Sequence, residues 1–204
     1  MPTVSPDFLR HSLTVYSAFL LFAVFIFRPL VVRLKYGVAG IKFKQTDPQM
    51  AVCAFGLKLV ISMDATSIVL LNGGQGLYQQ LGILPWGQLQ IFIWVGWFML
   101  LLGFVLITLG QHQMHAAWRI GLDTEVKTDL VRSGLFRASR NPIYLGIAAV
   151  LIGFFLTMPN GLTLSAWILG LFVLQITVLG EERFLRTLHG PFYDQYCKAV
   201  RRWL

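Results

Sequence analysis

The sequence predicts an all-α membrane protein: a polytopic bundle of five spanning helices followed by a C-terminal amphipathic helix at the interface. Two properties of the composition support this prediction. Of the 204 residues, 56% are hydrophobic and only 13% are charged, and the mean hydropathy is +0.66. A water-soluble domain of this length cannot bury so large an apolar share in one core, so lipid is expected to cover the rest.

Five apolar segments meet the requirement of about 20 residues that a helix needs to cross a hydrocarbon core of about 30 Å. The first is read as a retained anchor, because no small-residue cleavage site follows it. It continues irregularly past Arg28-Pro29 to residue 34, and a tight turn at 159–161 joins the last two. The predicted spans are residues 13–27, 51–71, 86–109, 142–158 and 162–179.

The cations predict the orientation of these spans. Lys and Arg gather in residues 28–44, 119–140 and 183–202, whereas the loops at 72–85 and 159–161 contain none. Because basic loops stay in the cytoplasm, the N-terminus is expected outside and the C-terminus inside. The net charge of +8 is divided among these segments, which favours anionic lipid headgroups and not nucleic acid as its partner.

Two charged residues, Lys58 and Asp64, lie inside the second predicted span. A charge at mid-depth is costly in lipid and often functional, as in a proton or ion relay. The alternative is that Lys58 extends toward the headgroups while Asp64 faces the bundle. The sequence favours the second interpretation, because six residues separate the two side chains and place them on different helix faces.

The third predicted span runs into a polar stretch with His112 and His115 on one face. Histidines at this spacing can bind a metal, but no carboxylate accompanies them at the spacing of a zinc protease. Cys53 and Cys197 also lack the paired spacing of a zinc site or a disulfide framework. We therefore expect no metal, and we expect the histidines to line a polar pocket.

Two further polar segments stand at the predicted cytoplasmic edge. Pro142 suits the first turn of the fourth span, and the free N–H groups there, with Arg140, favour an anion. Tyr144 falls inside the same turn. The fifth span ends in Glu181-Glu182, a carboxylate pair that needs nearby cations or donors. A routine membrane edge with interfacial Arg and Tyr is the alternative.

Together these residues resemble the isoprenylcysteine carboxyl methyltransferase family and its phospholipid N-methyltransferase relatives, over about residues 114–203. The family's motifs match at these positions: Trp118 and Arg119; Arg140, Pro142, Tyr144 and Gly146; Glu181 and Glu182; Gly190, Tyr193, Tyr196 and Val200. One position departs, because Asn141 stands where the family commonly has His, and Asn cannot carry a proton.

The resemblance implies an S-adenosylmethionine-dependent methyltransferase whose acceptor is an amphiphile or lipid from the bilayer, most like a prenylcysteine-type carboxyl O-methyltransferase. It implies that Arg119 or Arg201 orients the acceptor. It also implies a set of cofactor-binding residues: His115, Arg140, Asn141, Pro142, Tyr144, Leu145, Glu181 and Glu182. Within one integral membrane domain, residues 1–110 would hold spans one to three and residues 111–204 the catalytic segments with spans four and five.

Two other classes remain open at this point. One is a membrane NADPH-dependent reductase resembling the sterol reductases, which usually have more spans. The other is a transporter or scaffold in which Lys58 and Asp64 carry the function. The sequence does not choose among a carboxylate, amine or thiol acceptor, and it does not predict the oligomeric state. Gly96 and Gly103 could pack helices within one chain or between chains.

Overall fold

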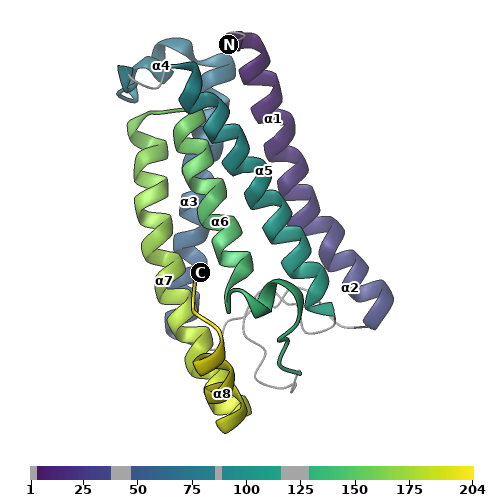
Figure 1. Cartoon of the computed structure of the whole chain (residues 1–204). Coiled ribbons are helices and arrows are strands. Elements are labelled where there is room, and N and C mark those ends of the chain that lie inside the picture. The colour runs from purple at the N-terminus through teal and green to yellow at the C-terminus, as the bar shows by residue number, and fades with distance from the viewer. Residues whose placement is uncertain (1–3, 38–46, 86–88, 116–128) are drawn as a thin grey trace.

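A computed structural model describes residues 4–37, 47–85, 89–115 and 129–204, and in these ranges every regular element is a helix. Figure 1 shows an elongated bundle in which α1, α3, α5, α6 and α7 run side by side. The helices are α1 (Pro6–Phe22), a π-helical turn (Ala23–Phe27), α2 (Arg28–Tyr36), α3 (Pro48–Gly73), α4 (Gln75–Gln80), α5 (Gln90–Gln113), a 3-10 turn (Gly134–Arg137), α6 (Pro142–Thr157), α7 (Gly161–His189) and α8 (Pro191–Ala199).

Four helices in the described ranges are long and apolar enough to cross a membrane: Pro6–Tyr36, α3, α5 and α7. The predicted fourth span forms helix α6, but its 16 residues make it shorter than these four. The structure thus supports four candidate spans where the sequence predicts five. The structure also differs from the prediction at α7, which continues ten residues beyond the predicted end at residue 179. Glu181-Glu182 therefore lies inside a helix and not at its end, which corrects the sequence prediction.

The irregularity predicted near Arg28-Pro29 is a π-helical turn. The Arg28 N–H bonds the Ala23 carbonyl five residues back, and the helix then continues to Tyr36. The buried Arg28 guanidinium donates from Nη2 to the Gln111 carbonyl and, at 3.2 Å, to the His115 carbonyl. A cation at the last carbonyls of a helix offsets their unpaired dipoles, so Arg28 fastens the first helix to the end of α5.

The closest helix pair is α5 with α6, and glycines allow the approach. A Cβ at Gly103 would lie 2.6 Å from the Gly146 carbonyl oxygen, and a Cβ at Gly146 would lie 2.8 Å from the Gly103 oxygen. Gly96 and Gly153, seven residues away on each helix, face each other in the same manner. Gly96 and Gly103 therefore pack helices inside this chain, one of the two alternatives that the sequence leaves open.

A short hairpin joins α6 to α7. Its turn is held by Asn160, which is fully buried. Asn160 Oδ1 accepts from the N–H groups of Leu162 and Thr163, and its Nδ2 donates to the Met158 carbonyl at 3.1 Å. The Thr163 hydroxyl returns the contact to the Asn160 N–H, which completes a capping box. These bonds start α7 directly beside the end of α6, which sets the two helices antiparallel.

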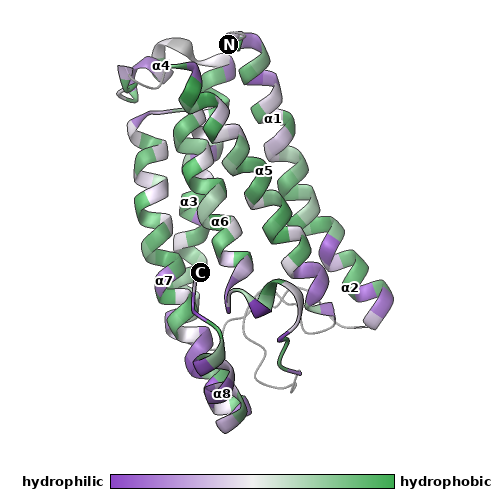
Figure 2. Cartoon of the chain, in the orientation of Figure 1, coloured by the Kyte–Doolittle hydropathy of each residue, from purple (hydrophilic) through white to green (hydrophobic). Residues whose placement is uncertain are grey.

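Many large apolar side chains are exposed on the outside of the bundle. Figure 2 shows hydrophobic residues, in green, along the helices and more hydrophilic residues, in purple, toward the ends of the bundle. Exposed phenylalanines occur on the long helices, including Phe22, Phe98 and Phe172. Such a surface suits lipid and not water. With the four candidate spans, it describes an integral membrane protein.

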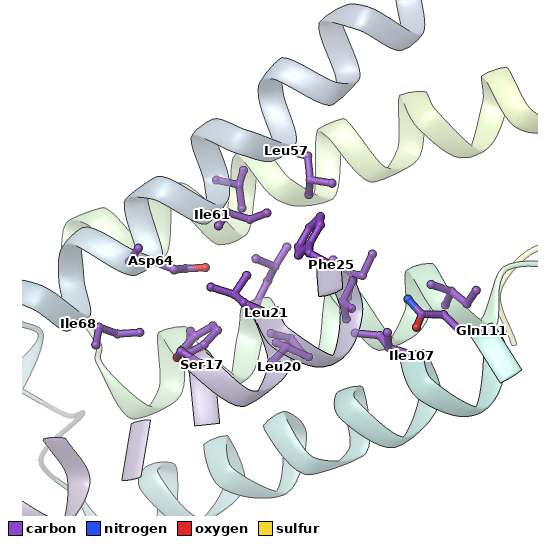
Figure 3. Close-up of a pocket in the computed structure, with 18 residues that line it drawn as sticks. Ser17, Leu20, Leu21, Phe25, Leu57, Ile61, Asp64, Ile68, Ile107 and Gln111 are labelled. Atoms are coloured by element: carbon purple, nitrogen blue, oxygen red, sulfur yellow. The ribbon is translucent and has the colours of Figure 1, made fainter. Parts of the chain in front are cut away.

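Packing between α1, α3, α5 and α6 leaves a cavity of about 150 Å³. Figure 3 shows Leu21 and Phe25 of the first helix facing Ile61 and Asp64 of α3 across it. Asp64 is 6% exposed and therefore faces the bundle, whereas Lys58 on the same helix is exposed. This agrees with the interpretation that the sequence favours. We call this space the inner cavity.

Candidate active site

A larger cavity, of about 290 Å³, lies at the end of the bundle where α3 begins, α5 ends and α6 begins. We call it the site cavity. Most of its wall is apolar and comes from α3, α6 and α7, with Cys53, Ile147 and Leu174 as examples. Polar side chains gather on one part of the wall: Gln111, Arg140, Asn141, Tyr144, Thr177 and Glu181. The cavity thus offers hydrogen-bonding groups beside an apolar surface, as expected for an amphiphilic ligand.

Tyr144 and Glu181 meet inside this cavity. Tyr144 lies on the first turn of α6 and Glu181 on α7, and the tyrosine hydroxyl donates to Glu181 Oε1. The hydrogen bond fixes the carboxylate from one side, and Glu181 lines the cavity wall. Its second oxygen has no hydrogen bond within the described part of the chain. This oxygen is a candidate acceptor for a hydroxyl or ammonium group of a ligand.

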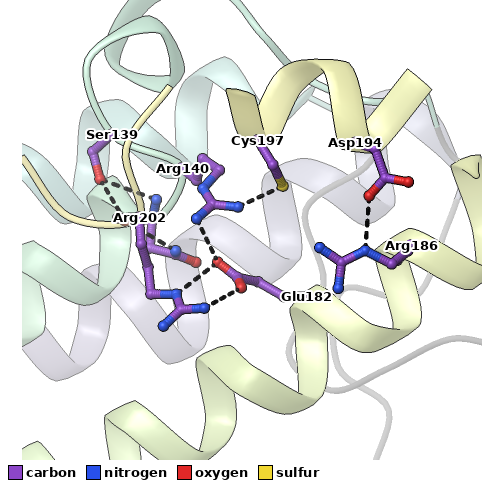
Figure 4. Close-up of polar contacts among 8 residues, drawn as sticks. Ser139, Arg140, Glu182, Arg186, Asp194, Cys197 and Arg202 are labelled. Atoms are coloured by element: carbon purple, nitrogen blue, oxygen red, sulfur yellow. Dashed lines mark hydrogen bonds and ion pairs between the residues drawn. The ribbon is translucent and has the colours of Figure 1, made fainter. Parts of the chain in front are cut away.

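Glu182, the neighbouring carboxylate, faces a different way because successive helix residues are turned by about 100°. It is 5% exposed and does not line the site cavity. Arg202 donates to both of its oxygens, at 3.0 and 2.8 Å, and Arg140 Nη2 lies 3.4 Å from Oε1 (Figure 4). This hydrogen bonding raises the pKa of the Arg202 guanidinium. Glu182 is therefore a partner for two arginines.

Arg140 connects this cluster to the cavity. One Nη donates to Cys197 of α8 and the other contacts Glu182 (Figure 4). Its Nε–H is buried and has no hydrogen-bond partner among the described residues. Since Arg140 also lines the site cavity, the structure presents a fixed cation with one unused donor at the cavity wall.

The C-terminal tail holds the segment before α6. The Arg140 N–H donates to the Arg201 carbonyl at 3.0 Å. The Arg202 carbonyl accepts from Ser139 Oγ at 3.3 Å and from Asn141 Nδ2 at 3.1 Å. Asn141 thus uses its amide N–H to bind the tail while it lines the site cavity. The tail therefore holds in place the backbone of residues 139–141, from which Arg140 and Asn141 extend to the cavity.

Helix α8 packs the 3-10 turn against the site. The Tyr196 hydroxyl donates to the Phe136 carbonyl at 2.6 Å, and burial raises the pKa of this hydroxyl to about 12. Tyr193 is almost fully buried, and burial raises its pKa as well. The Arg186 guanidinium lies 5.9 Å from the Tyr193 ring centre. Tyr193 and Tyr196 thus form the buried face of the predicted amphipathic helix.

Five of the eight residues predicted for cofactor binding line the site cavity: Arg140, Asn141, Pro142, Tyr144 and Glu181. The remaining three, His115, Leu145 and Glu182, do not. His115 is exposed at the end of α5, where Tyr36 Oη lies 3.4 Å from its Nδ1.

Of the two arginines predicted to orient the acceptor, only Arg201 lies among the described residues. The Arg201 side chain is exposed and does not line it. Arg119 and its neighbour Trp118 lie outside the described residues. Across the described part of the chain, no group of three His, Cys, Asp or Glu side chains could hold a metal.

Several cavity residues were not predicted as site residues, including Gln111, Met114 and Cys53. Arg202 was also missed as the partner of Glu182, although it follows Arg201 directly. No sequence signal marks Cys53, because its place in the wall depends on how α3 packs against α7. Gln111 could have been predicted as a cavity residue, because it lies in the polar stretch that ends α5.

The comparison with known families bears on this geometry. A family model described as phospholipid methyltransferase matches residues 91–191. These residues run from the start of α5 to the start of α8 and include Arg140, Tyr144 and Glu181. Over this region, the chain is similar to the phospholipid methyltransferase family. The match confirms the predicted resemblance to this group of membrane methyltransferases, whose members act on lipid substrates. Searches of curated proteins and of solved structures returned no match.

The family region supplies part of the site, and segments outside it supply the rest. Within 91–191 lie α6 and α7 with Tyr144 and Glu181. Outside it lie the π-helical turn (Ala23–Phe27) and α3, which contribute to the cavity wall, and Arg202, which holds Glu182. Segments on both sides of the family-matching region therefore contribute to the site cavity and its surroundings.

Proposed function

We propose that the protein is an S-adenosylmethionine-dependent methyltransferase that acts on a lipophilic acceptor, with its active site in the site cavity. The observation that carries this proposal is the Tyr144–Glu181 pair beside the Arg140 cation, inside a cavity built largely from the family-matching helices. Residues 111–204 would supply the catalytic segments and residues 1–110 the supporting spans.

The chemistry of the cavity wall fits the cofactor. S-adenosylmethionine carries a carboxylate, an ammonium group and ribose hydroxyls. The unused Arg140 Nε–H suits the carboxylate, since charge-assisted hydrogen bonds to arginine are the strong ones. The free oxygen of Glu181 suits an ammonium or a hydroxyl. Asn141 and Pro142 would line the same pocket, with His115, Leu145 and Glu182 contributing from its surroundings.

When bound, S-adenosylmethionine would supply an activated methyl group that the acceptor takes by direct displacement. The protein's part is to orient the reactants and to exclude water, which can contribute several kcal/mol without a metal. Tyr144 and Arg202 hold the two glutamates in place, and the apolar wall from α3 and α7 keeps water from the reacting atoms. Arg119, or Arg201 if its exposed side chain turns toward the cavity, would orient an anionic acceptor.

For the acceptor we propose a lipid carboxylate, methylated as in a prenylcysteine-type carboxyl O-methyltransferase, which needs no general base. A phospholipid amine is the second candidate, favoured by the family match and by Glu181, whose carboxylate could take the proton that an amine must lose. The two differ in their products. A methyl ester releases methanol in alkali, whereas an N-methyl group stays attached.

The acceptor test therefore uses purified protein, a total lipid extract and S-adenosylmethionine with a labelled methyl group. Label that alkali converts to volatile methanol identifies a carboxyl acceptor. Label retained on a polar lipid identifies an amine. Label in neither product refutes lipid methylation. A Glu181→Gln sample serves as the matched control, because it keeps the shape of the wall and removes the charge.

The cofactor test is calorimetric titration with S-adenosylhomocysteine. We expect Glu181→Gln and Arg140→Ala each to weaken binding about tenfold or more, the loss expected for one hydrogen bond to a charged group. Arg186→Gln is the control, because Arg186 pairs with Asp194 on the surface. Unchanged affinity in both site variants refutes the assignment. Binding of NADPH in place of S-adenosylhomocysteine would favour a reductase. Binding of neither compound would favour a transporter or scaffold.

We also propose that α6 is a fifth span, with the N-terminus outside, the site at the cytoplasmic face and α8 at the interface. The supporting observations are the apolar α6 packed along the length of α5 and the cations at the site end. Single cysteines at Ser5 and at Leu204 test the orientation through a membrane-impermeant maleimide on intact cells, in a Cys53→Ser, Cys197→Ser background. Labelling at residue 204 without labelling at residue 5 refutes it.

A further inference from the structure

The inner cavity adjoins the site cavity. The two share six wall residues: Val24, Phe25, Leu57, Gln111, Ile143 and Ile147. Asp64 lines only the inner cavity, eleven residues after Cys53, which lines only the site cavity. At 1.5 Å per residue of helix, these two positions are about 16 Å apart along α3. The joined cavities therefore extend from the polar site into the interior of the bundle.

Asp64 is the one acidic side chain in the wall of the inner cavity as the structure describes it. Its exposed fraction is 6%, so it is more than nine-tenths buried, and its Oδ1 has no hydrogen-bond partner among the described residues. Figure 3 shows the Asp64 carboxyl directed toward Leu21 and Ser17, away from the α3 axis. Buried carboxyl groups are normally hydrogen-bonded, so this one has capacity for a ligand.

Among the described side chains that line the inner cavity, none donates a hydrogen bond to Asp64 Oδ1. Ser17 faces the cavity, but its hydroxyl proton goes to the Leu13 carbonyl at 2.7 Å. Gln111 lies at the other end of the cavity in Figure 3. Lys58 is exposed on another face of α3. The group that satisfies Asp64 is therefore expected to enter with a ligand.

We propose that the inner cavity holds the distal part of the acceptor and that Asp64 selects acceptors with a hydrogen-bond donor there, a hydroxyl or an amine. This inference rests on the proposed function for the reacting end of the acceptor. The volume of about 150 Å³ matches that of an apolar cavity that accepts a benzene-sized group. The acceptor is thus an elongated lipid whose polar group lies well away from the reacting end.

The first helix gives this arrangement its shape. The π-helical turn at Ala23–Phe27 contains Val24 and Phe25, which line both cavities. A π turn inserts one residue into a helix and often occurs at functional sites. Here it directs two successive side chains into the shared wall, where they border both the reacting end and the distal end of the proposed acceptor.

The test compares fatty acids that differ by one donor. Tritiated octadecanoic acid is bound to the purified protein in a scintillation proximity assay and displaced by 12-hydroxyoctadecanoic acid or by unlabelled octadecanoic acid. A second pair, 12-aminododecanoic and dodecanoic acid, distinguishes an amine from a hydroxyl. The proteins are the parent, Asp64→Leu, Asp64→Asn and the control Lys58→Leu, which removes a charge from the exposed face of the same helix.

We expect the parent to prefer the donor-bearing member of at least one pair about tenfold, the effect of one hydrogen bond to a charged group. Asp64→Leu should abolish this preference, Asp64→Asn should reduce it, and Lys58→Leu should leave it unchanged. Equal binding of both members by the parent in both pairs overturns the inference, and so does an unchanged preference in Asp64→Leu.

S-adenosylhomocysteine binding is measured on the same samples to separate the two proposals. Asp64→Leu should retain it, because Asp64 does not line the site cavity. This result also verifies that the variant is folded. A parent that shows the donor preference but does not bind S-adenosylhomocysteine supports the role of Asp64 and refutes only the methyltransferase proposal. Loss of S-adenosylhomocysteine binding in Asp64→Leu overturns the separation of the two cavities.

Discussion

Glu182 of α7 accepts two hydrogen bonds from Arg202, through Nε at 3.0 Å and Nη2 at 2.8 Å. Because the Arg202 carbonyl also binds Ser139 and Asn141, the pair joins α7 to the segment that begins α6. Removing either charge should therefore affect stability and the position of Arg140 together.

Glu182→Ala is expected to lower the free energy of unfolding by about 2 kcal/mol, since a hydrogen bond to a charged group contributes about 1.5–3 kcal/mol and two arginines lose their partner. The measurement is thermal or denaturant unfolding in detergent. Asp194→Ala is the matched control, because its pair with Arg186 is about half exposed and surface pairs contribute about 0–1 kcal/mol. Equal losses in both variants would show that burial of Glu182 has no energetic effect.

Tyr144→Phe removes the hydroxyl that donates to Glu181 and leaves the ring in place. We expect about tenfold weaker binding of S-adenosylhomocysteine, because Glu181 then loses the contact that fixes it toward the cavity. Tyr196→Phe is the control, since its hydroxyl binds the Phe136 carbonyl and does not reach Glu181. Calorimetry that gives parent affinity for Tyr144→Phe would contradict a role for this hydrogen bond.

Gly103→Ala should destabilise the bundle by about 1–3 kcal/mol, the usual cost of overpacking. The added Cβ would lie 2.6 Å from the Gly146 carbonyl oxygen, which belongs to the backbone and cannot rotate away. Gly73→Ala is the control, because nothing lies within 4 Å of its added Cβ. Comparison of the two melting curves tests the close approach of α5 and α6, and similar curves would argue against it.

Asn160→Ala should lower the free energy of unfolding by about 1–2 kcal/mol, the range measured for loss of a helix N-cap. The variant leaves the N–H groups of Leu162 and Thr163 without their acceptor in a buried turn. Ser165→Ala changes an exposed hydroxyl in the same helix, which bonds only the Gly161 carbonyl, and should change stability little. A stable Asn160→Ala protein would mean that packing alone holds the α6–α7 hairpin.

The helical class and the approximate places of the long helices follow from the sequence, because an apolar run of about 20 residues has few alternatives in lipid. The hairpin at Pro159 and the start of α6 at Pro142 were also predictable, since proline and asparagine act locally. The end of α7 was not. Its last ten residues are polar enough to resemble a loop, and their helix is stabilised by contacts such as Arg202 with Glu182.

By itself, the sequence determined which residues are candidates for the site: Arg140, Tyr144 and the two glutamates stand in short motifs whose spacing can be read along the chain. Only the tertiary structure decided how they are used. Helix geometry turns Glu181 into the cavity and Glu182 toward Arg202, and packing of α1 and α3 places Asp64 beside an inner cavity. Those outcomes depend on which helix faces which, and contacts between residues distant in sequence decide that.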